Sequence, residues 1–364
     1  MATRNLSTPA GAAATVAPSP PRGRRRPRSR IHGRQTLAGW LFVTPALLCL
    51  GVFLVVPIAM AFWVSFQQWS GLAPLDTATP AGLHNYQELL VSEGVARTDF
   101  AKALRNNLYY VLGVVPLQTI LAFGLAVLVN SRLLKGRTFF RTAFYFPSVT
   151  SSVAVAFIFI FLFSPTGMVN QLLTALLPGT VETAWLDEPG GLIHIVLGRL
   201  GVDQAPELLA ENRLMGLSWW EWLSGPSVAM SAIMLLATWT TTGTLMLIFL
   251  GGLQNIPMEL EEASMIDGAT RWQHFRRVTV PLMQPTLFLV LTLGLIGTWQ
   301  VFDQVYAMTA GGPQKTTVTP AYLIYREGLD NSEMGRAAAI AFVLFALILT
   351  LTALQRLALR RKDA

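Results

Sequence analysis

Residues 255–285 read NIPMELEEASMIDGATRWQHFRRVTVPLMQP, a polar, charged segment between two long apolar runs. Pro257 suits the first turn of a helix, where its missing N–H costs nothing. Glu259 and its acidic neighbours then place negative charge near the positive end of the helix dipole. A helix is therefore predicted to begin here, outside the apolar runs on either side.

The second half of the same segment predicts a turn and another short helix. Gly268, after Asp267, is free to take the left-handed conformation that ends many helices. Thr270 and Gln273 fit a capping box at the start of a second helix. Pro281 is expected to end that helix. The whole segment is predicted to be a helix–turn–helix lying between two membrane spans.

Composition places the chain among membrane proteins. Its 364 residues are 52% hydrophobic and only 13% charged, with a mean hydropathy of +0.48. A soluble domain is nearer a quarter charged. The fold class predicted is therefore an all-α membrane protein that crosses the bilayer several times.

The net charge of +7 comes largely from the N-terminal tail, residues 1–36. This tail is rich in Ala, Pro and Ser and has no apolar periodicity, so it is predicted to be disordered. A basic tail before a first span is typical of a cytoplasmic terminus. Contact with anionic lipid is a plausible side effect, and nucleic-acid binding is disfavoured because no fold accompanies the tail. Its arginines are Arg4, Arg22, Arg24, Arg25, Arg26, Arg28, Arg30 and Arg34.

Apolar runs long enough to cross a bilayer predict six transmembrane helices within a domain over residues 37–357. They are expected at about 37–66, 108–129, 144–163, 228–250, 286–306 and 337–354.

The charges of the connecting loops predict the orientation of these spans. The short loop after the second span is basic, as is the C-terminal tail, so both are expected on the cytoplasmic side. The long connection 164–226 is acid-rich and is expected outside. With six spans, both termini are predicted to be cytoplasmic. The connection's residues 179–217 either touch an external partner or form a tolerated insertion.

The charged segment also carries a family resemblance. Glu262-Ala263-Ser264, then Gly268, then Val278-x-Val280-Pro281 resembles the EAA loop of binding-protein-dependent ABC importer permeases. Ser264 replaces an Ala of the family pattern, and two valines replace Ile and Leu. Phe146-Pro147-Ser148, Val301-Phe302-Asp303 and Gly311-Gly312-Pro313 resemble the branch that carries maltose, trehalose or glycerol 3-phosphate. The resemblance covers roughly residues 37–356.

The resemblance implies the type I ABC importer permease fold, with residues 255–285 as a cytoplasmic coupling loop that docks on an ATPase subunit. It also implies the partners: a second, related permease, two ATPase subunits and an external sugar-binding protein. The sequence by itself would also allow a homodimer. The residues expected to couple to the ATPase are Glu262, Ala263, Ser264, Asp267, Gly268, Ala269, Arg271, Phe275 and Pro281.

Nothing in the sequence predicts catalysis or a resident cofactor. No G-x-x-x-x-G-K-[ST] loop occurs, so ATP and Mg²⁺ are expected on the partner ATPase. The four histidines are scattered without zinc-ligand spacing, and Cys49 is the only cysteine. The spans have almost no mid-membrane ionisable residues of the kind that mark ion-coupled carriers. The chain is therefore expected to be a transport subunit and not an enzyme.

Polar and aromatic residues within the apolar runs are candidates for the substrate path. At helical spacing Trp299, Asp303 and Tyr306 would share one face, with Gln300 beside them. Polar clusters also occur at 148–152 and at 240–242. Helix–helix hydrogen bonding is the competing explanation for such residues. The path residues predicted are Trp239, Thr242, Trp299, Gln300, Asp303 and Tyr306.

The function expected is a permease subunit that forms half of the path for a di- or oligosaccharide across a bacterial cytoplasmic membrane. A permease for glycerol 3-phosphate or another polar solute is the first alternative. An ATP-independent carrier is the second, and a membrane-bound enzyme the third.

Overall fold

The computed structural model describes residues 33–131, 134–177, 179–202 and 204–360. The N-terminal tail predicted to be disordered lies outside these residues as far as position 32. From Gly33 onward the chain is already helical, so the first helix begins a few residues before the predicted span.

The chain is helical, with two very short antiparallel hairpins, which agrees with the predicted all-α class. The first half contains α1 (Gly33–Leu50), η1 (Gly51–Val55), α2 (Val56–Val64), β1 (Gln67–Gln68), η2 (Leu75–Thr77), β2 (Thr79–Pro80), α3 (His84–Leu90), α4 (Val95–Asn130), α5 (Arg137–Val149), α6 (Ser152–Leu162) and α7 (Met168–Leu176). The second half contains α8 (Leu192–Arg199), α9 (Glu207–Glu211), β3 (Arg213–Leu214), β4 (Leu217–Ser218), α10 (Trp219–Trp222), α11 (Val228–Gln254), α12 (Met258–Ile266), α13 (Arg271–His274), η3 (Phe275–Thr279), α14 (Val280–Leu282), α15 (Gln284–Trp299), α16 (Asp303–Met308), α17 (Pro320–Tyr325), η4 (Arg326–Asp330) and α18 (Met334–Arg360).

Four helices among the described residues are long and apolar enough to cross a membrane. They cover Ala38–Val64, Val95–Asn130, Val228–Gln254 and Met334–Leu357. Two bent helix pairs bring the number of candidate spans to six if each pair counts as one. The chain divides into two compact units, residues 1–57 and 58–364, and the described part of the first unit consists of α1, η1 and the start of α2.

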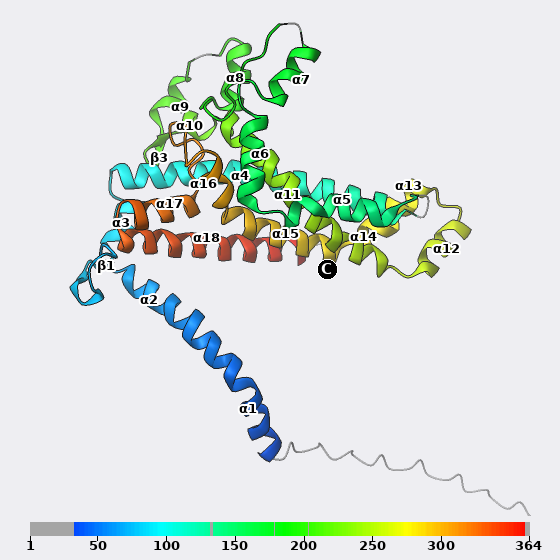
Figure 1. Cartoon of the computed structure of the whole chain (residues 1–364), viewed down its shortest axis with the longest axis horizontal. Helices are drawn as coiled ribbons and strands as arrows, with labels where there is room; N and C mark the ends of the chain where they lie inside the picture. The colour runs from blue at the N-terminus through cyan, green and yellow to red at the C-terminus, as the bar shows by residue number, and fades with distance from the viewer. Residues whose placement is uncertain (1–32, 132–133, 178, 203, 361–364) are drawn as a thin grey trace, which may run out of the picture. The chain divides into compact units, whose positions relative to one another are not determined.

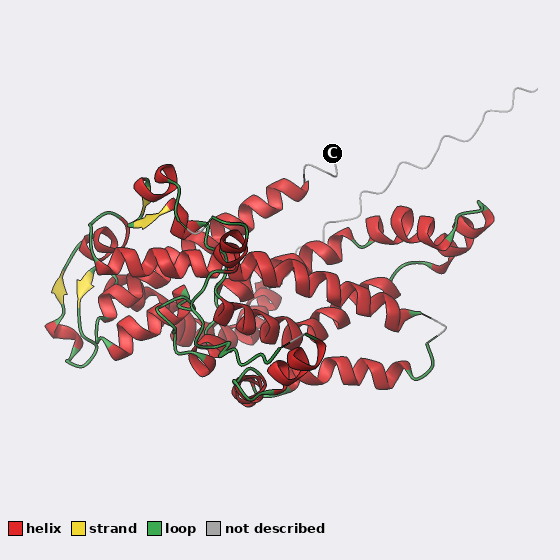
Figure 2. Ribbon diagram, turned by 90° about the horizontal axis from the view of Figure 1, so that it is seen from above, coloured by secondary structure: helices red, strands yellow, loops and turns green. Residues whose placement is uncertain are grey.

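In the second unit α11 is the central helix. It packs most extensively against α4, and further against α5, α15 and α16. The ribbon of this unit shows α12 and α13 extending beyond one end of the bundle, while the two short hairpins lie at the opposite end (Figures 1 and 2). Its buried core includes Phe100, Ile233 and Phe249. The second unit is therefore a helical bundle built around α11. The α12 and α13 helices extend from one end of it, and the two short hairpins lie at the other (Figures 1 and 2).

The predicted span at 144–163 is not one helix. It consists of the end of α5 and all of α6, which meet at an angle of 94°. Thr150 and Ser151 join them with extended backbone, at ψ 147° and 126°. Apolarity alone does not reveal such a bend, because the apolar residues continue from the end of α5 into α6.

The predicted span at 286–306 is also interrupted. Helix α15 ends at Trp299, and α16 begins at Asp303 after a break at residues 300–302. At its other end α15 meets the Arg271–Leu282 helix at an angle of 63°. Pro281 does not end that helix as expected, because α14 continues through it to Leu282.

Helix α4 begins at Val95, thirteen residues before the predicted second span. Its additional turns carry polar residues that are buried against connecting segments of the second unit. Asn106 donates hydrogen bonds to the carbonyl oxygens of Lys315 and Val318, and Arg105 donates to that of Glu221. A hydropathy profile starts this span too late, because the residues that bury the polar first turns of α4 are distant in the sequence.

Candidate functional site

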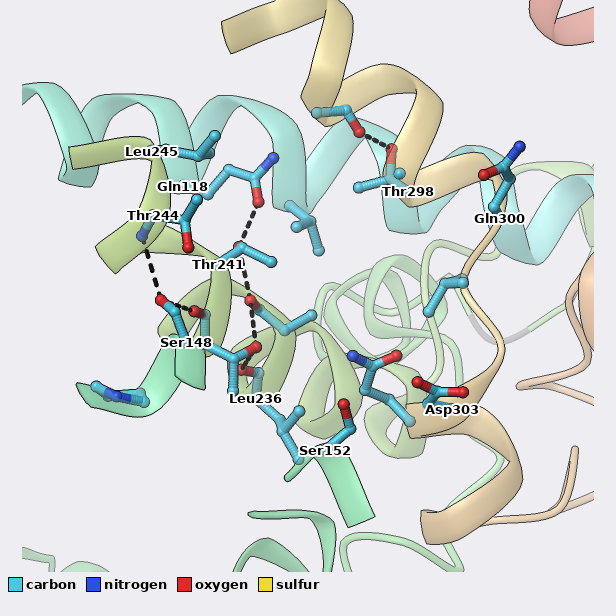
Figure 3. A pocket seen from close by; sticks show the side chains of 18 of the residues that line it. Gln118, Ser148, Ser152, Leu236, Thr241, Thr244, Leu245, Thr298, Gln300 and Asp303 are labelled. Atoms are coloured by element: carbon cyan, nitrogen blue, oxygen red, sulfur yellow. Dashed lines mark hydrogen bonds between the residues drawn. The ribbon is translucent and has the colours of Figure 1, made fainter. Parts of the chain in front are cut away.

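A cavity of about 430 Å³ lies inside the second unit, where α4, α5, α11 and α15 meet the break before α16. Its volume falls within the range of roughly 300–1,000 Å³ that is typical of ligand pockets. Figure 3 shows its polar side chains pointing inward from several helices. The polar and aromatic lining residues are Tyr110, Gln118, Ser148, Thr150, Ser152, Thr240, Thr241, Thr244, Thr298, Gln300, Phe302, Asp303 and Gln304.

One wall of the cavity is the close contact between α5 and α11. At Gly243 a Cβ atom would lie 2.3 Å from the carbonyl oxygen of Phe144, so only glycine permits this approach. Ser148 then donates a hydrogen bond of 2.6 Å to the carbonyl oxygen of Thr240 and accepts one of 3.2 Å from the N–H of Thr244. These two backbone groups are an i, i+4 pair of the α-helix. Ser148 thus fixes α5 to one turn of α11.

The opposite wall is centred on Gln118 of α4, a polar side chain that is only 2% exposed. Its Oε1 accepts a 2.6 Å hydrogen bond from the hydroxyl of Thr241 on α11 (Figure 3). The tight packing of α15 contributes here as well, since a Cβ at Gly294 would lie 2.8 Å from the Gln118 amide nitrogen. Three helices therefore meet at this one amide.

The structure separates the predicted path residues. Gln300 and Asp303 line the cavity. Trp299 does not line it and is buried against Val111 and Val115, with an indole N–H that has no partner among the described residues. The predicted shared face of Trp299, Asp303 and Tyr306 is wrong, because the break at 300–302 places them on two helices.

The other predicted path residues lie elsewhere. Thr242 is buried and donates its hydroxyl hydrogen bond to the carbonyl oxygen of Thr238 within α11. Trp239 packs against Phe159, away from the cavity. Tyr306 lines a separate pocket of about 260 Å³ that includes Asp187 and Pro313.

Sequence reasoning missed Gln118 and Thr298. Gln118 carried a usable signal, because a lone amide two residues after Pro116 is unusual in an apolar run. Thr298 gave no such signal, since Thr is an ordinary residue of membrane helices.

The charged segment 255–285 forms a hairpin of α12 and α13. The predicted capping box at Thr270 and Gln273 is confirmed. Gly268 has φ +76°, in the left-handed region, and nothing lies within 4 Å of the Cβ position there. Ser264 is buried, and its Oγ lies 2.7 Å from Nδ1 of His274 in a hydrogen bond between the two arms.

The outer surface of this hairpin is exposed and mixed in character. Large apolar side chains at Met265, Ile266 and Trp272 are open to solvent. Seven of the predicted coupling residues are exposed or half-buried beside them, namely Glu262, Ala263, Asp267, Gly268, Ala269, Arg271 and Pro281. Phe275 is the eighth, and its ring stacks on Trp272 at 5.6 Å and on Phe123 of α4 at 5.8 Å. The hairpin is thus joined to the bundle through aromatic contacts.

Ion pairs gather at the end of the bundle opposite the hairpin. Asp99 of α4 pairs with Lys315 at 2.8 Å and with Arg326 at 2.6 Å. Arg336 of α18 pairs with Glu88 and Glu327, both at 3.1 Å. Within the described ranges, no three His, Cys, Asp or Glu side chains gather where they could hold a metal ion.

The chain matches known transport proteins over most of its length. Residues 104–363 match the family model described as the binding-protein-dependent transport system inner membrane component. The chain is 31% identical to the probable ABC transporter permease protein YurN of Bacillus subtilis, over 87% of this chain and 94% of that protein. It is 30% identical to the arabinooligosaccharides transport system permease protein AraP of Bacillus subtilis, over 93% of each.

A solved structure shares the fold. The chain superimposes with a TM-score of 0.65 on a chain of a bacterial ABC transporter involved in the import of the acidic polysaccharide alginate. The match has 22% sequence identity and covers 90% of this chain and 96% of the other.

Proposed function

The chain belongs to the family of binding-protein-dependent transport system inner membrane components, and from that membership we propose that it forms half of a sugar path across a bacterial cytoplasmic membrane. The observation that carries the proposal is the cavity between α4, α5, α11 and α15. Its hydroxyl and amide groups suit the hydroxyls of a saccharide. Two relatives of similar length, AraP and the lactose transport system permease protein LacF of Rhizobium radiobacter, are sugar permeases by name.

We further propose that ATP is hydrolysed, with Mg²⁺, on a partner ATPase subunit. The α12–α13 hairpin is the segment suited to receive that partner. It combines exposed apolar side chains such as Ile266 and Trp272 with charged groups such as Glu262 and Arg271. Gly268 at its turn leaves room for a second backbone to approach closely. This arrangement would place the hairpin and both termini in the cytoplasm.

The test of coupling is the variant Gly268→Asp. An L-residue in the left-handed region costs about 1–2 kcal/mol. Because Gly268 is exposed at the turn of the hairpin, we expect this strain to remain local and the bundle to stay folded. We expect the variant to reach the membrane and to lose sugar uptake. Gly268→Asn is the matched control for size, because Asn adopts this conformation more readily and adds no charge. Wild-type uptake by Gly268→Asp would refute the coupling role.

The partner set is tested by purification from detergent-solubilised membranes followed by mass spectrometry. We expect an ATPase, a second permease and a sugar-binding protein to accompany the chain. Solute movement in liposomes by the chain alone, without ATP, would instead establish the carrier alternative. Glycerol 3-phosphate is a weaker candidate substrate, because no Lys, Arg or His lines the cavity among the described residues.

A further inference from the structure

Most hydroxyl groups of the cavity are already engaged within the protein. Thr240 donates to a carbonyl oxygen one turn back in α11, Thr298 does the same in α15, and Thr241 donates to Gln118. Ser148 and Thr150 are likewise bonded to backbone carbonyl oxygens. Because each hydroxyl has one hydrogen and has given it to the protein, these Ser and Thr residues offer a solute acceptor lone pairs and no free donor.

A second set of polar side chains is free. Gln300, Asp303 and Gln304 make no side-chain hydrogen bond or ion pair with any described residue, although all three line the cavity. They are together because the helix breaks between α15 and α16, which brings three polar residues within five positions to the same opening. The buried Gln118 adds an amide nitrogen that has no partner within the described part of the chain.

The charge of this free set is purely negative. Asp303 is the only carboxylate on the cavity lining, and no cationic side chain of the described residues accompanies it there. Asp303 is exposed at the opening of the cavity, where the repulsion between two unit charges about 4 Å apart is about 1–4 kcal/mol. A sugar carboxylate or phosphate at this place would lack any compensating charge.

We propose that Asp303 is a specificity-determining residue, which makes the cavity select uncharged saccharide units and reject uronic acids and sugar phosphates. The carboxylate accepts hydrogen bonds from two adjacent hydroxyls, and the amides of Gln300, Gln304 and Gln118 both donate and accept. Phe302 and Tyr110 supply apolar ring surface beside them. This inference rests on the proposed sugar transport, whose failure would be seen separately in the experiments below.

The first experiment measures the electrostatic potential of the cavity without any sugar. Cys49, the only cysteine, is replaced by Ala, and Gln304→Cys is introduced into the full chain within its purified complex. The thiol is reacted with a cationic and an anionic methanethiosulfonate reagent of similar size. The ratio of the two rates reports local charge and is independent of the thiol pKa, which affects both reactions equally.

We expect the cationic reagent to react faster at Gln304→Cys, and the ratio to fall roughly tenfold when Asp303→Asn is added. Thr180→Cys, exposed on the external segment, is the matched control and should keep its ratio. An unchanged ratio at Gln304→Cys would overturn the proposal. So would failure of both reagents to react, because the cavity would then not admit solutes.

The second experiment measures uptake in cells that lack their own copy of the gene. Neutral probes such as lactose and arabinotriose are compared with digalacturonate, in wild type and in Asp303→Asn. We expect at least tenfold preference for a neutral probe in wild type, and a loss of several-fold in its uptake by the variant. Equal uptake of neutral and acidic probes would refute the charge selection and leave sugar transport standing. Uptake of none would refute the proposed function itself, whatever the reagent ratio.

Discussion

Ser264 and His274 hold the two arms of the α12–α13 hairpin together through a 2.7 Å hydrogen bond. Ser264 is the position at which this chain departs from the Ala of the family pattern, so the bond is a feature of this sequence. We predict that Ser264→Ala will increase hydrogen exchange over residues 258–274, because a part-buried hydrogen bond contributes about 1 kcal/mol. His274→Ala should have the same effect, and the double variant should add little more. Additive effects in that cycle would show that the two side chains act independently.

His194, in the long connection between α6 and α11, should respond to pH. Its ring stacks on Trp220 at 4.3 Å, and Nε2 lies 3.1 Å from the carbonyl oxygen of the same residue. Burial lowers its pKa below the ordinary value of 6.5, and Arg105 lowers it further, against the opposing effect of the carbonyl. The folded state therefore binds this proton less readily than the unfolded state does.

This lowered pKa predicts that local stability is complete above pH 6.5 and is lost as the pH falls through the lowered value. The protection of the backbone amides of residues 191–224 against hydrogen exchange, relative to their intrinsic rates, should consequently fall below pH 6.5. His194→Gln, which stays neutral, should abolish that dependence. A pH-dependent loss of protection that persists in the variant would contradict the assignment to His194.

The residues of the cavity show how far sequence reasoning reaches at this scale. The sequence predicts Asp303 on the path through a helical face shared with Trp299 and Tyr306, with Gln300 beside it, and both line the cavity although that face does not exist. Trp299 was placed on the path by assuming that one helix continues to Tyr306, which the break at 300–302 rules out. Gln118 was missed because its role depends on Thr241, more than a hundred positions later in the chain. The hydrophobic pattern locates polar residues within apolar runs, but only the tertiary structure shows which of them contact one another.

At the scale of elements, the contact of α5 with α11 depends on one glycine. A Cβ at Gly243 would come within 2.3 Å of a backbone oxygen of α5, which cannot shift as a flexible side chain can. We predict that Gly243→Ala forces the helices apart, at a cost of roughly 2 kcal/mol. The thermal unfolding temperature of the purified chain should fall accordingly.

Gly251 provides the control on the same helix. Nothing lies within 4 Å of the Cβ position there, so Gly251→Ala should be neutral or stabilising through its better helix propensity. Equal destabilisation by the two substitutions would mean that flexibility of α11, and not the close contact, requires glycine.

The corner between α5 and α6 could not be predicted from the sequence. Thr150 and Ser151 are compatible with a helix, and we attribute their extended backbone to the packing of α5 against α11. Ser148 is held by α11 just before the corner, and Gly243 lets the α5 backbone approach that helix. The bend therefore belongs to the packing of two elements, which a single apolar run does not encode.

At the scale of the whole molecule, the ion pairs connect segments that the sequence separates widely. Asp99 near the start of α4 binds Lys315 in the loop before α17 and Arg326 in η4. Arg326 also lies 3.7 Å from Glu327, which in turn pairs with Arg336 at the start of α18. These charges thus connect the start of α4 to the start of α18, at the same end of the bundle.

We predict that Asp99→Asn lowers the thermal unfolding temperature of the purified protein, because it leaves Arg326 largely buried without its closest carboxylate. Removing one partner of a buried pair typically costs about 3 kcal/mol. Asp76→Asn is the matched control, since Asp76 is exposed and makes no ion pair within the described residues. A double variant that also replaces Arg326 by Met should recover part of the loss, because no uncompensated charge then remains at that position. If the Asp99→Asn and Asp76→Asn variants unfold at the same temperature, the ion pairs of Asp99 do not contribute measurably to stability. The helix contacts around α11 would then account for it.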